Sequence, residues 1–219
     1  MNLDLHVHSI FSGDSPVPPE DYARRMVELR AEYELDGFVL MEHNFWVRPE
    51  VCDLAALSAK YGLTILAGVE ADTYWGHLLI YGVTDRLWNE LAGNGKKKQE
   101  PVWLTKVAEE EGAVVVPAHP FRGMISLGDH IQELPHLCAL EVINGGNLPE
   151  ENLWASNLAS KMGLSKVGGS DAHFLDELGL GATEFEVEVN TLEELVREIK
   201  AGRVRALCRD ELQISSCPA

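Results

Sequence analysis

Short apolar runs alternate along the chain with longer segments of helical periodicity, a pattern that few fold classes can accommodate. The apolar runs predict strands at residues 3–8, 37–42, 64–69, 77–83, 113–117, 139–143, 166–169, 184–189 and 204–207. Helices are predicted from Pro19 onward and at residues 49–61, 101–111, 149–162 and 192–201. This alternation favours an α/β fold with a mainly parallel sheet, and it leaves an open doubly wound sheet and a closed barrel both possible.

Composition and charge narrow the range of partners. The 219 residues are 46% hydrophobic and 24% charged, and no shift in composition divides them, so we expect one domain over residues 1–219. A net charge of −17 repels a long nucleic acid. No apolar stretch approaches the roughly 18 residues of a membrane span. The chain begins without a basic and apolar leader, so we expect a cytoplasmic protein whose four cysteines are reduced thiols.

Histidines and acids gather where the predicted strands start or stop. Six of the eight histidines and two carboxylates lie at such positions: His6, His8, His43, Glu70, His77, His119, Asp171 and His173. Because side chains on a strand alternate between faces, His6 and His8 should point the same way. The C-terminal ends of parallel strands share one rim, where α/β active sites lie.

Imidazoles and carboxylates that converge on one rim predict a metal site, in which an acid can bridge two ions. This mixture of nitrogen and oxygen ligands suits zinc, manganese or iron. It contains too many nitrogens for calcium or magnesium alone.

Several short motifs follow one another in a fixed order along the chain. They are Asp4-Leu5-His6-Val7-His8-Ser9, Ser12-Gly13-Asp14-Ser15, Glu42-His43-Asn44, Gly68-Val69-Glu70, His77-Leu78-Leu79-Ile80-Tyr81-Gly82, Ala118-His119-Pro120 and Gly169-Ser170-Asp171-Ala172-His173. Together they resemble the ordered motifs of the polymerase and histidinol phosphatase (PHP) family, over residues 4–173. The resemblance implies a distorted seven-stranded (β/α) barrel that carries two or three divalent transition-metal ions and hydrolyses phosphoesters.

Carried over position by position, the resemblance assigns ligands to each ion. The expected ligands are His6, His8, Glu70 and Asp171 for the first ion, Glu70, His119 and His77 for the second, and Asp14, His43 and His173 for the third. How His43, His77 and Asp14 divide between the second and third ions stays open. The chain departs from the family at Glu42, where Asp is common, and Glu42 is expected to replace that acid as the partner that orients His43.

The charge of such a site determines its chemistry. Three carboxylates do not neutralise three divalent ions, so the pocket should attract a compact phosphate even in an acidic protein. The expected reaction is in-line attack of a metal-bridged hydroxide on phosphorus. Asp171 is expected to orient or deprotonate the water, and His173 or His43 to assist the leaving group.

Two arginines are the expected phosphate contacts. Arg122 follows His119 closely, and Arg48, the weaker choice, lies on the loop after His43. The expected substrate is a small phosphorylated molecule: a phosphomonoester, a nucleotide or a cyclic phosphate. The segments 84–100 and 122–136 are expected to be loops that cover the pocket.

Three other functions compete with this interpretation. An amidohydrolase-type barrel also begins with His-x-His, but it usually bridges its metals with a modified lysine, and here Glu70 occupies the bridging position. A non-catalytic, metal-binding PHP module is disfavoured by the complete set of ligand motifs. A nuclease is disfavoured by the net charge of −17, although short oligonucleotides remain possible substrates.

Overall fold

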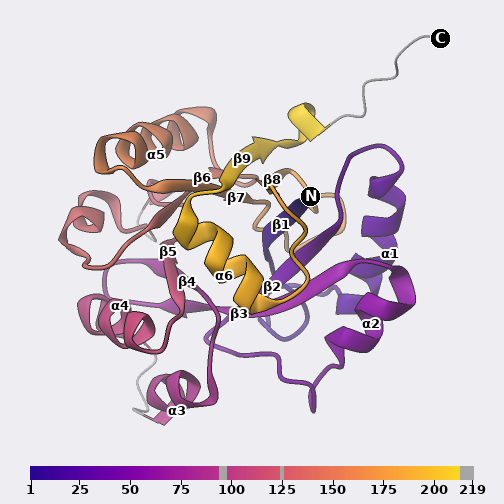
Figure 1. The fold of residues 1–219 in the computed structure, drawn as a ribbon, viewed down its shortest axis with the longest axis horizontal. Helices are drawn as coiled ribbons and strands as arrows, with labels where there is room; N and C mark the ends of the chain where they lie inside the picture. The colour runs from indigo at the N-terminus through magenta and orange to yellow at the C-terminus, as the bar shows by residue number, and fades with distance from the viewer. Residues whose placement is uncertain (94–97, 124–125, 213–219) are drawn as a thin grey trace.

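A curled sheet of seven strands forms the framework of the protein (Figure 1). The computed structural model describes residues 1–93, 98–123 and 126–212. The strand order in the large sheet is β5-β4-β3-β2-β1-β8-β9, and β6 and β7 form a second sheet. The strands are β1 (Asn2–Val7), β2 (Gly37–His43), β3 (Thr64–Asp72), β4 (His77–Tyr81), β5 (Val114–Pro117), β6 (Ala139–Asn144), β7 (Ser165–Gly169), β8 (Gly181–Phe185) and β9 (Val204–Cys208).

The predicted α/β class is confirmed, but the sheet is mixed rather than mainly parallel. β2 runs parallel to β1 and β3, whereas β4 runs antiparallel to β3 and β5, and β8 runs antiparallel to β1 and β9. β4 runs antiparallel to β3 because the connection between them is a short turn, in which the Thr73 N–H donates to the Gly76 carbonyl at 2.9 Å. Such a turn is too short for a parallel crossover. β4 therefore starts at the rim where β3 ends.

The β6–β7 pair is joined to the end of β1. The Asp171 N–H donates to the His6 carbonyl at 2.7 Å, and the His8 N–H donates to the Ala172 carbonyl at 2.9 Å. Val7 and Ala172 form an isolated parallel bridge. The expected barrel is thus a curled seven-stranded sheet with a separate parallel pair, and the main-chain hydrogen bonds of the described strands do not form a closed ring.

Helices pack against both the outer and the inner face of the curled sheet. They are α1 (Pro19–Arg30), α2 (Leu54–Tyr61), α3 (Asp85–Gly93), α4 (Pro101–Glu110), α5 (Pro149–Met162) and α6 (Leu192–Ala201), with short 3-10 helices η2 (Gly128–Glu133) and η3 (Arg209–Leu212). α1 and α2 lie on one side, α3, α4 and α5 on the other, and α6 crosses the middle (Figure 1). Leu195 and Ile199 of α6 pack with Leu3 and Val39 in the inner core, near the strand ends remote from the histidines.

A bulge in β1 turns two histidines toward the inside. The pairing register of β1 with β2 shifts between Asp4 and Val7, and such a shift changes the face on which later side chains lie. Regular alternation would place Leu5 and Val7 on one face. Instead, Leu5 packs with α6 on the inner face of the curled sheet, and Val7 packs with α1 on its outer face. The bulge thereby directs His6 and His8 to the inner side of the sheet.

Two predicted elements begin elsewhere in the structure. The helix predicted at 49–61 starts at Leu54, because the Asp53 carboxylate caps it by accepting a hydrogen bond from the Ala56 N–H at 2.9 Å. The strand predicted at 184–189 is β8, which starts at Gly181 because it pairs with both β1 and β9 over that range.

The two segments expected to be loops contain regular structure. In segment 84–100, α3 buries Leu87 and Leu91, which lie four residues apart on one helix face; residues 94–97 lie outside the described residues. In segment 122–136, η2 buries Ile131, and residues 124 and 125 lie outside the description. A search of the described helices for a long apolar segment that could cross a membrane found none.

Candidate metal centre

The strand ends bring the predicted ligands together at one rim. His43 is the last residue of β2, Glu70 lies near the end of β3, and His77 opens the antiparallel β4. The others lie at or beyond the end of β1, β5 or β7: His6, His8, Asp14, His119, Asp171 and His173. His6, His8 and Glu70 are fully buried, so much of the cluster is enclosed by the fold.

Four of these side chains have the spacing of a tetrahedral metal site. The Nε2 atoms of His6 and His8 lie 3.0 Å apart, and each lies between 3.0 and 3.4 Å from Oε2 of Glu70 and Oδ1 of Asp171. Ligands at bond lengths of about 2.0–2.1 Å around a tetrahedral ion lie about 3.3 Å from one another. The group therefore matches the expected ligand set of the first ion in membership and in size.

Glu70 lies at the centre of the cluster, with histidines around both carboxylate oxygens. Oε1 lies 2.9 Å from Nδ1 of His77 and 3.1 Å from Nε2 of His119. Oε2 faces His6 and His8, and it also lies 3.2 Å from Nδ1 of His43. One carboxylate thus touches two separate sets of imidazoles, as a ligand shared by two ions must.

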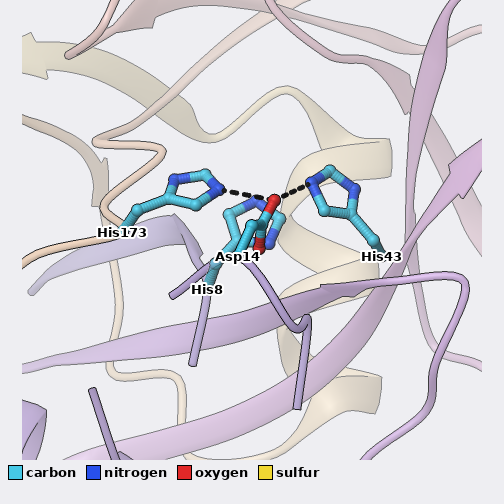
Figure 2. Close-up of side chains that lie close together, drawn as sticks. All are labelled: His8, Asp14, His43 and His173. Carbon is cyan, nitrogen blue, oxygen red and sulfur yellow. Dashed lines mark ion pairs between the residues drawn. The ribbon is translucent and has the colours of Figure 1, made fainter. Parts of the chain in front are cut away.

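Asp14 joins a third set of side chains at a more exposed point of the rim. Its Oδ2 lies 3.3 Å from Nε2 of His43 and 3.3 Å from Nε2 of His173, which approach it from opposite sides (Figure 2). The His8 ring stacks on both, with centroids 4.5 Å from His43 and 4.4 Å from His173. The side chain of Asp14 is 49% exposed, so this part of the cluster is open to solvent.

The donor set fits divalent transition metals better than it fits an internal hydrogen-bond network. The buried Nδ1 atoms of His43 and His119 have no hydrogen-bond partner in the described part of the chain. Two Nε2 atoms that face each other at 3.0 Å can share only one proton between them. A cation between the facing Nε2 atoms of His6 and His8 would accept their lone pairs and so remove the second deficit.

Buried carboxylates control the charge of the imidazoles. Burial lowers the pKa of His8, but Asp171 and Glu70 outweigh burial and raise it to about 9. Burial is likewise outweighed at His6, whose pKa is raised well above its ordinary value by Asp171, Glu141 and Glu70. Without metal the centre therefore holds protons at neutral pH, and a metal ion must displace them.

The other members of the cluster follow the same balance. Burial raises the pKa values of Glu70 and Asp171, but nearby imidazoles outweigh it and hold both well below their usual range. Burial dominates at His43, whose pKa is lowered, and the positive charges of His8 and His77 act in the same direction. The centre thus contains ionised carboxylates beside a mixture of charged and neutral imidazoles.

Left-handed backbone conformations occur where the strands give way to the cluster. Asn44, His119 and Asp171 have φ values of 50°, 29° and 58°. Non-glycine residues adopt such conformations at a cost and need support from neighbouring groups. His119 receives support through its N–H, which donates to the Glu141 carboxylate at 2.5 Å, and Asp171 through its N–H, which donates to the His6 carbonyl.

The expected role of Glu42 is wrong. Its carboxylate accepts hydrogen bonds from the Ser9 N–H and hydroxyl and from the Ser12 hydroxyl, the last at 2.5 Å, and it does not contact the His43 ring. The Ser12 oxygen in turn lies 2.9 Å from Nδ1 of His8. The longer Glu side chain reaches past its own strand to the loop after β1, so it orients His8 through Ser12.

Two buried acids of the centre are absent from the sequence predictions. Asp4 accepts hydrogen bonds from the N–H groups of Ser170 and Gly179, and burial raises its pKa to about 6. Glu141 contacts His6, with Oε1 at 2.9 Å from Nδ1. Each is a carboxylate within an apolar strand, which is the signal that could have identified it, because unpaired charges are rarely buried.

The two predicted phosphate-binding arginines have different surroundings. Arg122 reaches the cluster, and its Nη1 donates to Oδ2 of Asp171 at 2.6 Å. Arg48 pairs with Asp85 at the start of α3 and lies over the Trp46 ring, 5.2 Å from its centroid. The guanidinium of Arg48 is therefore held away from the cluster, whereas that of Arg122 lies beside a predicted ligand.

A cavity of about 330 Å³ adjoins the cluster on the Arg122 side. Its walls include Asp14, Arg122, Asp171 and His173, together with other residues of the loops after β6 and β7: Gly145, Gly146, Ser170, Phe174, Glu177 and Leu180. A cavity of this size can hold a small molecule beside the cluster.

Comparisons with known proteins place this architecture among described structures. A two-domain protein from Bacteroides vulgatus ATCC 8482, described as containing a predicted PHP-like metal-dependent phosphoesterase, superimposes with a TM-score of 0.67 at 20% identity, over 96% of this chain and 65% of that one. A lesion-specific endonuclease from Pyrococcus furiosus has a TM-score of 0.63 at 19% identity, over 94% of this chain and 57% of that one. Both relatives are therefore considerably longer than this chain.

An amidohydrolase from Chromobacterium violaceum, solved with bound sulfate and without metal, has a TM-score of 0.63 at 17% identity, over 95% of this chain and 98% of that one. At these identities the three structures establish a shared fold. A comparison with curated proteins found no match. The family model described as PHP-associated matches residues 149–204. This match, together with the fold shared with the PHP-like protein, agrees with the resemblance seen in the motifs.

Proposed function

We propose that the protein is a metal-dependent hydrolase that cleaves a phosphoester of a small molecule with two or three divalent transition-metal ions, either manganese, zinc or iron. The observation that carries this proposal is the tetrahedral spacing of His6, His8, Glu70 and Asp171. In the proposed assignment these four hold the first ion. The remaining ligands are Glu70, His77 and His119 for the second ion, and Asp14, His43 and His173 for the third.

When bound, such ions lower the pKa of a coordinated water from about 15.7 toward about 7 and offset the charge of a phosphoryl group. The other roles fall to residues of the chain. Asp171 orients the attacking water and accepts its proton. Arg122, whose Nη1 lies 2.6 Å from Oδ2 of Asp171, binds the phosphoryl oxygens next to that water. Where only the first two ions are bound, His173 or His43 is free to donate a proton to the leaving group.

The surroundings of the cluster favour a compact substrate. The cavity beside Arg122 measures about 330 Å³, and the net charge of −17 opposes a long polyanion. The fold is also shared with an endonuclease and with an amidohydrolase. Glu70 touches both sets of imidazoles and so occupies the bridging position, which favours a phosphoesterase over an enzyme that needs a modified lysine there.

A substrate screen tests the proposal. Chelator-treated protein is assayed with manganese, zinc and iron separately against sugar phosphates, mononucleotides, cyclic phosphates, a short oligonucleotide and an N-acyl amide. We expect metal-dependent release of phosphate, or opening of a cyclic phosphate. Hydrolysis of the amide or the oligonucleotide alone, or no hydrolysis with any metal, would contradict the proposal.

Matched variants keep the screen specific to the cluster. Glu70→Gln should abolish the activity because it removes the shared carboxylate. Glu198→Gln is the control: Glu198, on α6, is also a buried carboxylate, but it pairs with Arg203 outside the cluster. Equal activity of the two variants would show that the measured hydrolysis does not arise at this centre.

A further inference from the structure

Glu141 is a buried carboxylate in the middle of an apolar strand. It lies in β6 and is 1% exposed. It meets Nδ1 of His6, whereas Nε2 of that ring faces Glu70 and Asp171, so Glu141 lies on the side of the ring away from the first ion group. Its position therefore calls for a role other than direct metal binding, because burying an isolated carboxylate is costly.

Three donors from separate parts of the chain meet at this carboxylate. Oε1 lies 2.9 Å from Nδ1 of His6. Oε2 accepts a hydrogen bond from the His119 N–H at 2.5 Å and another from Nδ2 of Asn144 at 2.9 Å. Glu141 thus touches a proposed ligand of the first ion and the backbone of a proposed ligand of the second.

Asn144 links Glu141 to Arg122, the residue proposed to bind phosphate. While its amide nitrogen donates to Glu141, its Oδ1 accepts hydrogen bonds from Nη2 of Arg122 and, at 2.9 Å, from the Gly146 N–H. Asn144 is 1% exposed, so solvent does not compete for these bonds. A second amide, that of Asn147, holds Nε of Arg122 at 2.8 Å. The guanidinium is therefore fixed in direction before any substrate arrives.

We propose that Glu141 is a positioning residue that serves both halves of the centre. It fixes His6 with the proton on Nδ1 and the lone pair of Nε2 directed toward the first ion, and through Asn144 it aims Arg122 at the phosphate. This inference rests on the proposed function. Its consequence is that metal affinity and phosphate affinity share a dependence on one carboxylate, whereas Asn144, which reaches the proposed ligand Asp171 only through a long contact of 3.5 Å, acts chiefly on phosphate affinity.

A carboxylate is required because every group around Glu141 is a donor. Gln offers one acceptor oxygen and one NH2 group. With its oxygen toward His6, the NH2 group opposes the donors of His119 and Asn144. With the amide turned over, Nδ1 of His6 must become an acceptor, which places the proton on Nε2 and blocks metal binding. Neither orientation of Gln satisfies the site.

The test measures binding rather than turnover. Zinc affinity of chelator-treated protein and affinity of the zinc-loaded protein for inorganic phosphate are determined by calorimetry for the wild type, Glu141→Gln, Asn144→Ala and Glu198→Gln. We expect Glu141→Gln to lose zinc affinity by about 10- to 100-fold and to lose phosphate affinity as well. Asn144→Ala removes only a long contact of 3.5 Å to Asp171, so it should lose zinc affinity far less than Glu141→Gln does, and it should lose phosphate affinity about tenfold. Glu198→Gln should match the wild type in both.

The remaining outcomes would overturn the inference about Glu141, and one of them would overturn the proposed function as well. Wild-type zinc affinity in Glu141→Gln overturns this inference and leaves the proposed function intact, whereas a wild type that binds neither zinc, manganese nor iron overturns both. Glu141→Asp guards against a misfolded Gln variant: it keeps the charge but withdraws it from His6 by one methylene, so we expect zinc affinity to fall. An unchanged affinity in Glu141→Asp would show that only a buried negative charge is needed, and positioning would be refuted.

Discussion

Raising the pH from 6.5 to 9 should destabilise the metal-free protein. Burial lowers the pKa of His8, but the hydrogen-bonded carboxylates of Asp171 and Glu70 outweigh it and raise the pKa from 6.5 to about 9. The folded state thus holds this proton more tightly than the unfolded state. The resulting stabilisation is complete below pH 6.5 and is lost as the pH rises through 9.

The size of the effect follows from the shift. At 1.36 kcal/mol per pKa unit, a shift from 6.5 to about 9 at a fully buried group corresponds to about 3 kcal/mol, a large part of the roughly 5–15 kcal/mol that stabilises a typical domain. The pKa values of His6 and His77 are raised as well, so they act in the same direction. Those of Glu70 and Asp171 are held well below their usual range, and these acids titrate outside the window.

Urea unfolding of chelator-treated protein, followed by tryptophan fluorescence, measures this loss at several pH values from 6.5 to 9. We expect the free energy of unfolding to fall by about 3 kcal/mol, His8→Gln to reduce the fall, and His130→Gln, an exposed histidine outside the cluster, to leave it unchanged. Saturating zinc should remove the fall, because the ions replace the protons. Equal stability of the metal-free protein at pH 6.5 and 9 would refute the reasoning.

Three further changes probe other parts of the centre. Asp171→Asn should reduce phosphate release by about 100-fold or more while keeping the circular dichroism spectrum, because it removes the group that accepts the proton; unreduced turnover would exclude that role. Turnover at limiting metal should rise from pH 6 to 9, since protons compete with metal for the histidines, and a flat profile would contradict this. Gly146→Ala should raise KM about tenfold, a change of about 1.4 kcal/mol, because its Cβ would lie 2.7 Å from Nη2 of Arg122. Gly93→Ala, with open space around its Cβ, is the control, and an equal KM in both variants would argue against a phosphate contact by Arg122.

Much of the clustering at the candidate site could be predicted from the sequence because its proposed ligands lie at the ends of recognisable strands. The spacing of His6 and His8 and the acids after β3 and β7 follow from strand periodicity and motif order. His77 was expected at a strand start, and the antiparallel direction of β4 explains how it reaches the common rim. Local sequence patterns were enough to place a proposed ligand when its position is set by the strand that carries it.

Features that depend on distant partners could not be predicted in this way. The bulge that turns His6 inward appears only when β1 is paired with β2. Glu42 was assigned to its sequence neighbour His43, but its carboxylate binds the loop after β1. Glu141 contacts His6 across 135 positions of sequence. Side-chain partners of this kind are fixed by packing, which sequence periodicity does not encode.

Anomalous diffraction at the metal absorption edge, from crystals grown with manganese or zinc, tests the central claim most directly. The account predicts a strong peak within bonding distance of Nε2 of His6 and His8, Oε2 of Glu70 and Oδ1 of Asp171, with at least one further peak on the opposite side of Glu70. Side chains arranged as described but without anomalous density among them would contradict the existence of a metal centre.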